Sequence, residues 1–204
     1  MRLLNAMFLT LAFTCVMAPS HAYTVADVDL KEVVPATAER PELHLNGASL
    51  RELYLLIETY VGALYLEQPS KDANAILDSE THKRMVFHVM MKKVGARRIA
   101  NALQEALVLN VTKEQHNALR KDIELMLSFF EGRLHRGEES HFDYLPGIGT
   151  RVTINNVEKG IIPGKDFYRA LLSIWIGENP VGRTFKNEIL GLNENDIEGS
   201  IAGQ

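Results

Sequence analysis

The amino-acid sequence predicts an α+β protein in which a layer of helices covers one face of a large antiparallel sheet. Extended runs rich in leucine, valine, tyrosine and phenylalanine dominate the chain between residues 42 and 91, and these residue types favour strands. Segments with helical periodicity become frequent only after them. Strands that come first and helices that come later, without strict alternation, indicate an antiparallel sheet with segregated helices.

The first 22 residues, "MRLLNAMFLTLAFTCVMAPSHA", are set apart by their composition. A basic start at Arg2, an apolar run over residues 3–17 and a small-x-small ending at residues 20–22 predict a cleavable secretory signal. An anchoring helix is the alternative, but the run is shorter than the roughly 20 apolar residues that cross a bilayer. We therefore expect residues 23–204 to form one domain that is exported to a periplasm, with no stable membrane insertion of the mature chain.

Composition argues against several classes of protein. The chain has a formal net charge of −4, and no stretch has the clustered basic charge of a nucleic-acid surface. Its one cysteine, Cys15, lies in the expected signal, so the mature chain would fold without a disulfide. The histidines include no pair three or four residues apart on an expected helix and have no thiol companion, so we expect neither a metal site nor a cofactor.

The N-terminal half of the domain is predicted to supply most of the sheet. Residues 23–40 are polar and contain one candidate edge strand, "VDLKEVV", which ends at Pro35. "ELHL" at 42–45, "LNGASLRELYLLIETYVGALYLE" at 45–67 and "HKRMVFHVMM" at 82–91 are expected to be strands. "SKDANAILDS" between them is expected to be a short helix or a loop.

Two helices are predicted next. In "VGARRIANALQEALVLN" one apolar stripe is formed by Ile99, Leu103, Ala106 and Leu107. A second helix is expected to begin at Thr112, whose hydroxyl can cap the helix while Gln115 reaches back, and to end at Gly132.

The C-terminal part is predicted to contain one hairpin and further helices. Residues 133–149 are expected to be a long irregular connection. "RVTINNVEKGII" is expected to be a hairpin that turns near Asn155 and Asn156, and "KDFYRALLSIWIG" a helix that ends at Gly177. Two segments complete the domain: a short helix, "RTFKNEIL", and a frayed tail at 193–204.

Arg51 is the residue that the strand pattern explains least. If residues 45–67 form one continuous strand, Arg51 is in register with Leu53, Ile57 and Val61 and its charge points into the apolar face. A buried guanidinium without a partner costs several kcal/mol, so a partner is expected. That partner is either a bound anion or an intramolecular carboxylate, unless the arginine lies in water at the end of the strand.

Three blocks of sequence resemble the chalcone isomerase fold family, and in particular its exported bacterial chalcone isomerase-like members. These blocks are "NGASLR", "YVGALYLE" and, about 130 residues later, "FYRALLSIWIGENPVGRTFKNEILG". The resemblance covers residues 43–191, and the blocks occur in the family's order. It implies a chalcone isomerase-like open-faced β-sandwich, a large antiparallel sheet covered by a layer of helices.

The resemblance also implies positions for a site. In plant chalcone isomerases, an arginine in the first block stabilises the anion that forms when the chalcone phenolate attacks the enone, and this position is Arg51. Their threonine in the second block matches Tyr60, with Thr59 beside it. A tyrosine and an asparagine on the following helix match Arg98 and Glu105, so both are replaced.

The third block also departs from the catalytic pattern. A threonine-methionine pair before "IGE" is replaced by Ile174 and Trp175, and Trp175 is either a platform for a ligand or part of the core. The arginine is thus retained while most of its polar partners are lost. That combination is similar to the non-catalytic branch of the family, whose plastid members bind fatty acids with the carboxylate on the same arginine.

We therefore expect a protein that binds a small hydrophobic anionic ligand, such as a fatty acid, in a cleft with Arg51 at its polar end. The residues expected to contact the ligand are Arg51, Leu53, Thr59, Tyr60, Arg98, Ile99, Ile174 and Trp175. One alternative is an isomerase or intramolecular lyase that acts on a chalcone-like enone, with Arg51 and Tyr60 as its catalytic residues. A second alternative is a non-catalytic scaffold subunit of an exported complex. No nucleic-acid partner is expected.

Overall fold

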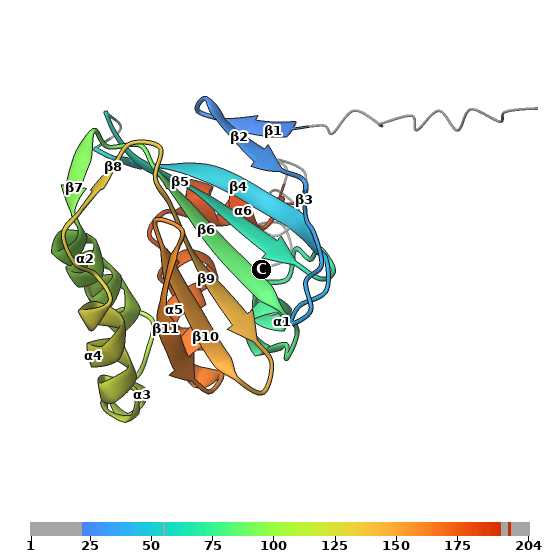
Figure 1. Cartoon of the computed structure of the whole chain (residues 1–204). Helices are drawn as coiled ribbons and strands as arrows, with labels where there is room; N and C mark the ends of the chain where they lie inside the picture. The colour runs from blue at the N-terminus through green and yellow to red at the C-terminus, as the bar shows by residue number, and fades with distance from the viewer. Residues whose placement is uncertain (1–21, 55, 193–195, 197–204) are drawn as a thin grey trace, which may run out of the picture.

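A curved antiparallel sheet forms the centre of the molecule (Figure 1), and the computed structural model describes residues 22–54, 56–192 and 196. The sheet has seven strands in the order β11-β10-β9-β6-β5-β4-β3. Their bounds are β3 Val33–Val34, β4 Leu43–Leu53, β5 Ile57–Leu66, β6 Lys83–Val89, β9 Glu139–Leu145, β10 Gly149–Ile154 and β11 Val157–Pro163. All neighbouring strands are antiparallel, as predicted.

Two small two-stranded sheets and a layer of helices complete the fold (Figure 1). The first is a hairpin of β1 Ala22–Val25 and β2 Val28–Lys31, and the second pairs β7 Lys93–Gly95 with β8 Arg133–His135. The helices are α1 Ala73–Asp78, α2 Ala96–Val108, α3 Lys113–Ala118, α4 Arg120–Ser128, α5 Asp166–Ile176 and α6 Arg183–Ile189. The predicted α+β class is confirmed.

The two faces of the sheet bury different cores. Along β5, Leu64 and Leu66 belong to the larger core beneath the helices, whereas Val61 and Ala63 belong to a smaller core on the opposite face, which also contains Leu30 of β2. This alternation follows from the two-residue period of a strand. The helix-facing side therefore holds most of the buried apolar volume, and any internal pocket is expected there.

The short helix α6 packs against the first half of β4. The Asn46 side chain donates a hydrogen bond to the Ile189 carbonyl over 2.9 Å and accepts one from the Ser70 amide over 2.7 Å. At Gly47 an added Cβ would lie 2.1 Å from the carbonyl oxygen of Glu188, so only glycine allows this close approach. The sequence blocks "NGASLR" and "FKNEILG" are therefore in direct contact.

Residues 45–67 form a hairpin, so the prediction of one continuous strand is wrong. β4 ends at Leu53 and β5 begins at Ile57, with Tyr54 in the intervening turn at a φ of 54°. Arg51 pairs directly with Tyr60 across the hairpin, and paired residues share a face of the sheet. Arg51 therefore lies on the helix-facing side, the opposite side from Val61.

The prediction of an irregular connection at residues 133–149 is also wrong, because this segment contains β8 and β9. Along β9, Phe142 and Tyr144 face the helices, while His141 and Asp143 alternate with them on the other face. Charged residues on one face and a glycine at position 137 make this segment resemble a loop in sequence.

Most local predictions for the rest of the chain are confirmed. Thr112 and Gln115 form the predicted capping box, although the helix divides into α3 and α4 at Leu119. Asn155 and Asn156 occupy the predicted turn with φ values of 50° and 59°. The expected signal lies outside the described residues apart from Ala22, and the expected tail does so apart from Asp196. No helix in the described part of the chain is long and apolar enough to span a membrane.

Candidate ligand-binding site

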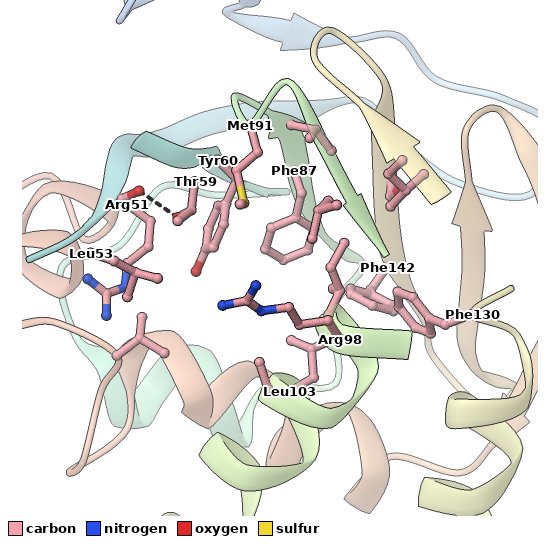
Figure 2. Close-up of a pocket in the computed structure, with 17 residues that line it drawn as sticks. Arg51, Leu53, Thr59, Tyr60, Phe87, Met91, Arg98, Leu103, Phe130 and Phe142 are labelled. Atoms are coloured by element: carbon pink, nitrogen blue, oxygen red, sulfur yellow. Dashed lines mark hydrogen bonds between the residues drawn. The ribbon is translucent and has the colours of Figure 1, made fainter. Parts of the chain in front are cut away.

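A mostly apolar pocket of about 330 Å³ lies between the helix-facing side of the sheet and α2 (Figure 2). Strands β5, β6 and β9 supply one wall, while α2 and the segments around β7 and β8 supply the other. Its apolar lining includes Phe87, Val89, Leu103, Phe130, Leu134 and Phe142. A site of this kind excludes water from the chain of an apolar ligand.

Polar side chains gather at one end of this pocket. Arg51 comes from the end of β4, Thr59 and Tyr60 from the start of β5, and Arg98 from the first turn of α2. The Thr59 hydroxyl donates a 2.6 Å hydrogen bond to the Arg51 carbonyl, which ties the two strand ends together. In Figure 2 the guanidinium of Arg98 points toward the Tyr60 hydroxyl.

Both arginines at this end lack a carboxylate partner within residues 22–54, 56–192 and 196. The Arg51 Nη1 donates a hydrogen bond to the neighbouring carbonyl of Glu52, and the side chain is half-buried. A carbonyl satisfies one donor but neutralises no charge. The polar end of the pocket therefore carries two positive charges that no described carboxylate pairs, one on half-buried Arg51 and one on exposed Arg98, and an anion is the ligand group that it favours.

Tyr60 is held in a fixed position by aromatic neighbours. Its hydroxyl oxygen accepts a 3.0 Å hydrogen bond from the indole nitrogen of Trp175, and its ring makes edge contacts with Phe87 and Phe185 at centroid distances of 5.4 and 5.7 Å. Burial raises the pKa of Tyr60 to about 12, against the opposing effects of Trp175 and Arg51. The hydroxyl therefore keeps its proton at neutral pH and can donate a hydrogen bond to a ligand.

The structure brings together six of the eight residues that the sequence predicted for the site. Those that line the pocket are Arg51, Leu53, Thr59, Tyr60, Arg98 and Ile99. The prediction that Ile174 and Trp175 form part of the wall needs correction, because both are 1% exposed and lie in the core outside the lining. Trp175 lies behind Tyr60 and Phe87, with its ring 4.9 Å from that of Phe87, and reaches the site only through them.

Sequence reasoning missed the part of the pocket that β9 supplies. Phe142 and Ser140 line it from this strand, and the alternation in "SHFDY" was the signal that could have revealed them. The Ser140 residue is 6% exposed, and its hydroxyl has no hydrogen-bond partner among the described residues. From β9, Ser140 therefore adds a polar group beside the apolar Phe142.

The fold and the pocket define an α+β protein with an apolar site between an open antiparallel sheet and its helices. Residues 22–191 match the family described as chalcone isomerase-like, so the chain belongs to the chalcone isomerase-like family. Among solved structures it is similar to the crystal structure of a fatty-acid-binding protein from Arabidopsis thaliana, with a TM-score of 0.64 and 15% sequence identity. That match covers 90% of this chain and 100% of the plant chain. No curated protein matches the sequence.

Proposed function

We propose that the protein binds a long-chain carboxylate, such as a fatty acid, with its head group between Arg51, Arg98 and the hydroxyl of Tyr60. The observation that carries this proposal is an apolar pocket whose polar end holds two arginines that pair with no carboxylate among the described residues. A guanidinium can give a carboxylate two parallel hydrogen bonds. Each buried CH₂ of the ligand chain adds about 0.8 kcal/mol. The fatty-acid-binding protein of similar fold supports the same ligand class.

Replacement of Arg51 by methionine tests this proposal. We expect the delipidated wild-type protein to bind palmitate and Arg51→Met to bind it about 10–100-fold more weakly, because a hydrogen bond to a charged group contributes about 1.5–3 kcal/mol. Arg51→Lys keeps the charge but loses the planar fork, so its affinity should fall between the two. Isothermal titration calorimetry measures all three. Arg120→Met, which removes an exposed arginine of α4 outside the pocket, is the matched control.

The stability of the ligand-free variant separates binding from a structural role. If the ligand is the main partner of Arg51, then Arg51→Met removes an uncompensated charge, and the melting temperature of the empty protein should be unchanged or higher. A variant that unfolds without ligand but retains the wild-type affinity for palmitate would assign Arg51 to a structural contact and contradict the proposal.

Isomerisation of a chalcone-like enone is the competing function. In that reaction Tyr60 would have to supply a proton, but a pKa of about 12 makes its hydroxyl a weak acid at neutral pH. Incubation of the protein with a chalcone tests this point, because cyclisation well above the spontaneous rate would favour the enzyme. Native mass spectrometry of the protein as purified addresses the scaffold alternative, which requires no lipid in the pocket.

We further propose that the protein is exported to a periplasm, as the expected signal at residues 1–22 indicates. The secreted form should then begin near Tyr23. N-terminal sequencing of the protein from a periplasmic extract measures this directly. An intact Met1 on a protein recovered from the cytosol would contradict export.

A further inference from the structure

The turn that joins β4 to β5 exposes large apolar side chains. We call Leu53, Tyr54, Leu56 and Ile57 the β4–β5 tip; they are 37%, 88%, 87% and 48% exposed. Single exposed apolar residues are ordinary on protein surfaces, but several together on one protruding turn are a mark of an interaction site.

Folding requirements do not account for these residue types. Tyr54 has a φ of 54°, a conformation in which glycine and asparagine are favoured and a bulky side chain is uncommon. In the β10–β11 hairpin of the same chain, the positions with positive φ are occupied by Asn155 and Asn156, which tolerate this conformation. An aromatic residue at the strained and most exposed position of the β4–β5 tip therefore points to a contact outside the chain.

Basic side chains lie beside the tip. A groove beside it is lined by Leu56 and Ile57 together with Met90, Lys92, Lys93 and Arg136. The carboxylates of Glu52 and Glu58 also line this groove, and that of Glu58 pairs with Arg136 over 3.7 Å. Lys92 and Lys93 are exposed and form no ion pair within the described part of the chain. Together with the pocket residues Arg51 and Arg98, these lysines make this end of the molecule locally positive, although the chain has a formal net charge of −4.

The tip also forms the rim of the ligand pocket. Leu53 lines the pocket, and Met91 lines both the pocket and the groove, as Figure 2 shows for the pocket side. The Met90 amide donates a 3.0 Å hydrogen bond to the Thr59 carbonyl, which fixes the lysine-bearing segment against β5. In Figure 1 the turn lies beside β7 and β8, away from the N-terminal hairpin.

We propose that the β4–β5 tip docks on the surface of a lipid bilayer that carries anionic headgroups. Tyrosine is enriched where proteins meet the membrane interface, and exposed apolar side chains gain by entering it. Lys92 and Lys93 flank the tip and match the negative surface potential of such a bilayer. A narrow apolar protrusion with flanking lysines fits a deformable lipid surface better than a protein partner, which needs about 800 Å² of complementary surface.

The two most exposed residues of the tip, Tyr54 and Leu56, lie outside the pocket lining, so docking through them does not depend on the proposed ligand. If both proposals hold, the mouth of the pocket faces the bilayer when the protein is docked, so an amphiphile could exchange without crossing open water. The palmitate affinity of a tip variant in solution should equal that of the wild type, which keeps failure of one proposal distinguishable from failure of the other.

Co-sedimentation with vesicles tests the proposal. We expect the purified protein to bind vesicles of phosphatidylglycerol and phosphatidylethanolamine more strongly than vesicles of phosphatidylcholine, and added salt to weaken that binding. The double variant Tyr54→Asn/Leu56→Ser should bind the anionic vesicles at least about tenfold more weakly than the wild type does. Asparagine is chosen because it tolerates positive φ. In the double variant Lys92→Glu/Lys93→Glu, binding to the anionic vesicles should weaken by about tenfold or more, so that the preference for them is lost.

Matched controls change exposed apolar residues and exposed lysines elsewhere on the surface. Ile148→Ser/Val157→Ser removes two side chains that are each 54% exposed, and Lys113→Glu/Lys121→Glu reverses two exposed charges of α3 and α4. Both controls should bind vesicles like the wild type. Absence of vesicle binding by the wild type, or equal binding by the tip variants, would overturn the proposal. So would a wild-type dimer in analytical ultracentrifugation that the tip variants abolish, because the occupant of the tip would then be a second copy.

Discussion

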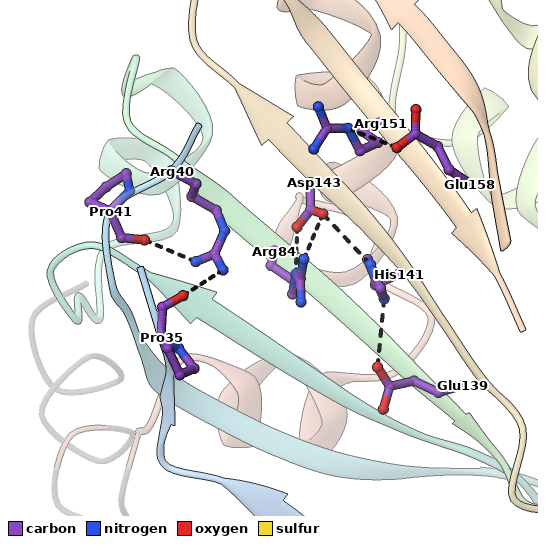
Figure 3. Close-up of polar contacts among 9 residues, drawn as sticks. All are labelled: Pro35, Arg40, Pro41, Arg84, Glu139, His141, Asp143, Arg151 and Glu158. Atoms are coloured by element: carbon purple, nitrogen blue, oxygen red, sulfur yellow. Dashed lines mark hydrogen bonds and ion pairs between the residues drawn. The ribbon is translucent and has the colours of Figure 1, made fainter. Parts of the chain in front are cut away.

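Asp143→Ala is expected to lower the free energy of unfolding by about 3–5 kcal/mol, because it leaves the mostly buried guanidinium of Arg84 without its partner. Asp143 is 2% exposed, and the side chain of Arg84 on the neighbouring strand is 18% exposed. Arg84 donates two hydrogen bonds to the carboxylate, Nε to Oδ1 over 2.5 Å and Nη2 to Oδ2 over 2.8 Å (Figure 3). His141 also lies 3.7 Å from this carboxylate.

Urea unfolding at neutral pH measures this loss, with two comparisons. Asp78→Ala removes a carboxylate that is 61% exposed and paired with Arg169, and an exposed pair contributes at most about 1 kcal/mol. The double variant Arg84→Met/Asp143→Leu removes both buried charges, so it should be more stable than Asp143→Ala alone. A loss below about 1 kcal/mol for Asp143→Ala would mean that water reaches Arg84 and compensates its charge.

The features that could be predicted from the sequence are those that a few neighbouring residues determine. The capping box of Thr112 and Gln115 and the turn at Asn155 and Asn156 depend on local hydrogen bonds and local backbone preferences. The fold class followed from the order of extended and helical runs, which is also a property of the chain read in sequence. Such features need no knowledge of which distant segments meet.

Strand β9 was missed although "SHFDY" alternates, because the charges on its other face are stabilised by a distant partner. Asp143 is 59 residues from Arg84 in the chain, and no local pattern indicates that the two charges neutralise each other. Lys83 of β6 is also buried, at 2% exposed, but its partner is local: its amine donates a 2.6 Å hydrogen bond to the carbonyl of Ser79. In sequence, both charged residues indicate a solvent-facing position.

The candidate site was predicted in part because the family resemblance pointed to two residues that the structure places across one hairpin. Arg51 and Tyr60 lie opposite each other on β4 and β5, and the family resemblance had singled out both. The depth of a residue below the pocket surface could not be predicted. Ile174 and Trp175 lie on a helix that is buried on nearly all sides, and only the three-dimensional arrangement shows that the Tyr60 ring stands between Trp175 and the pocket.

Gly47→Ala is expected to lower the free energy of unfolding by about 3 kcal/mol, at the upper end of the usual cost of inserting a methyl group into a packed site. The added Cβ would lie 2.1 Å from the carbonyl oxygen of Glu188 and 2.6 Å from that of Ile189. Both atoms belong to the backbone, so no change of rotamer relieves the clash, and α6 must move away from β4. Phe185 on α6 would move with it, and its ring packs against Tyr60.

The same substitution should therefore also weaken palmitate binding, although Gly47 lies outside the pocket lining. Gly95→Ala is the matched control, because a Cβ at that position meets nothing within 4 Å and its φ is −70°; its cost at the N-cap of α2 should stay below about 1 kcal/mol. Urea unfolding and calorimetric titration with palmitate measure the two effects on each variant. If the free energy of unfolding of Gly47→Ala is within about 1 kcal/mol of the wild-type value, then α6 separates from β4 at little cost. In that case close packing does not explain the glycine in "NGASLR".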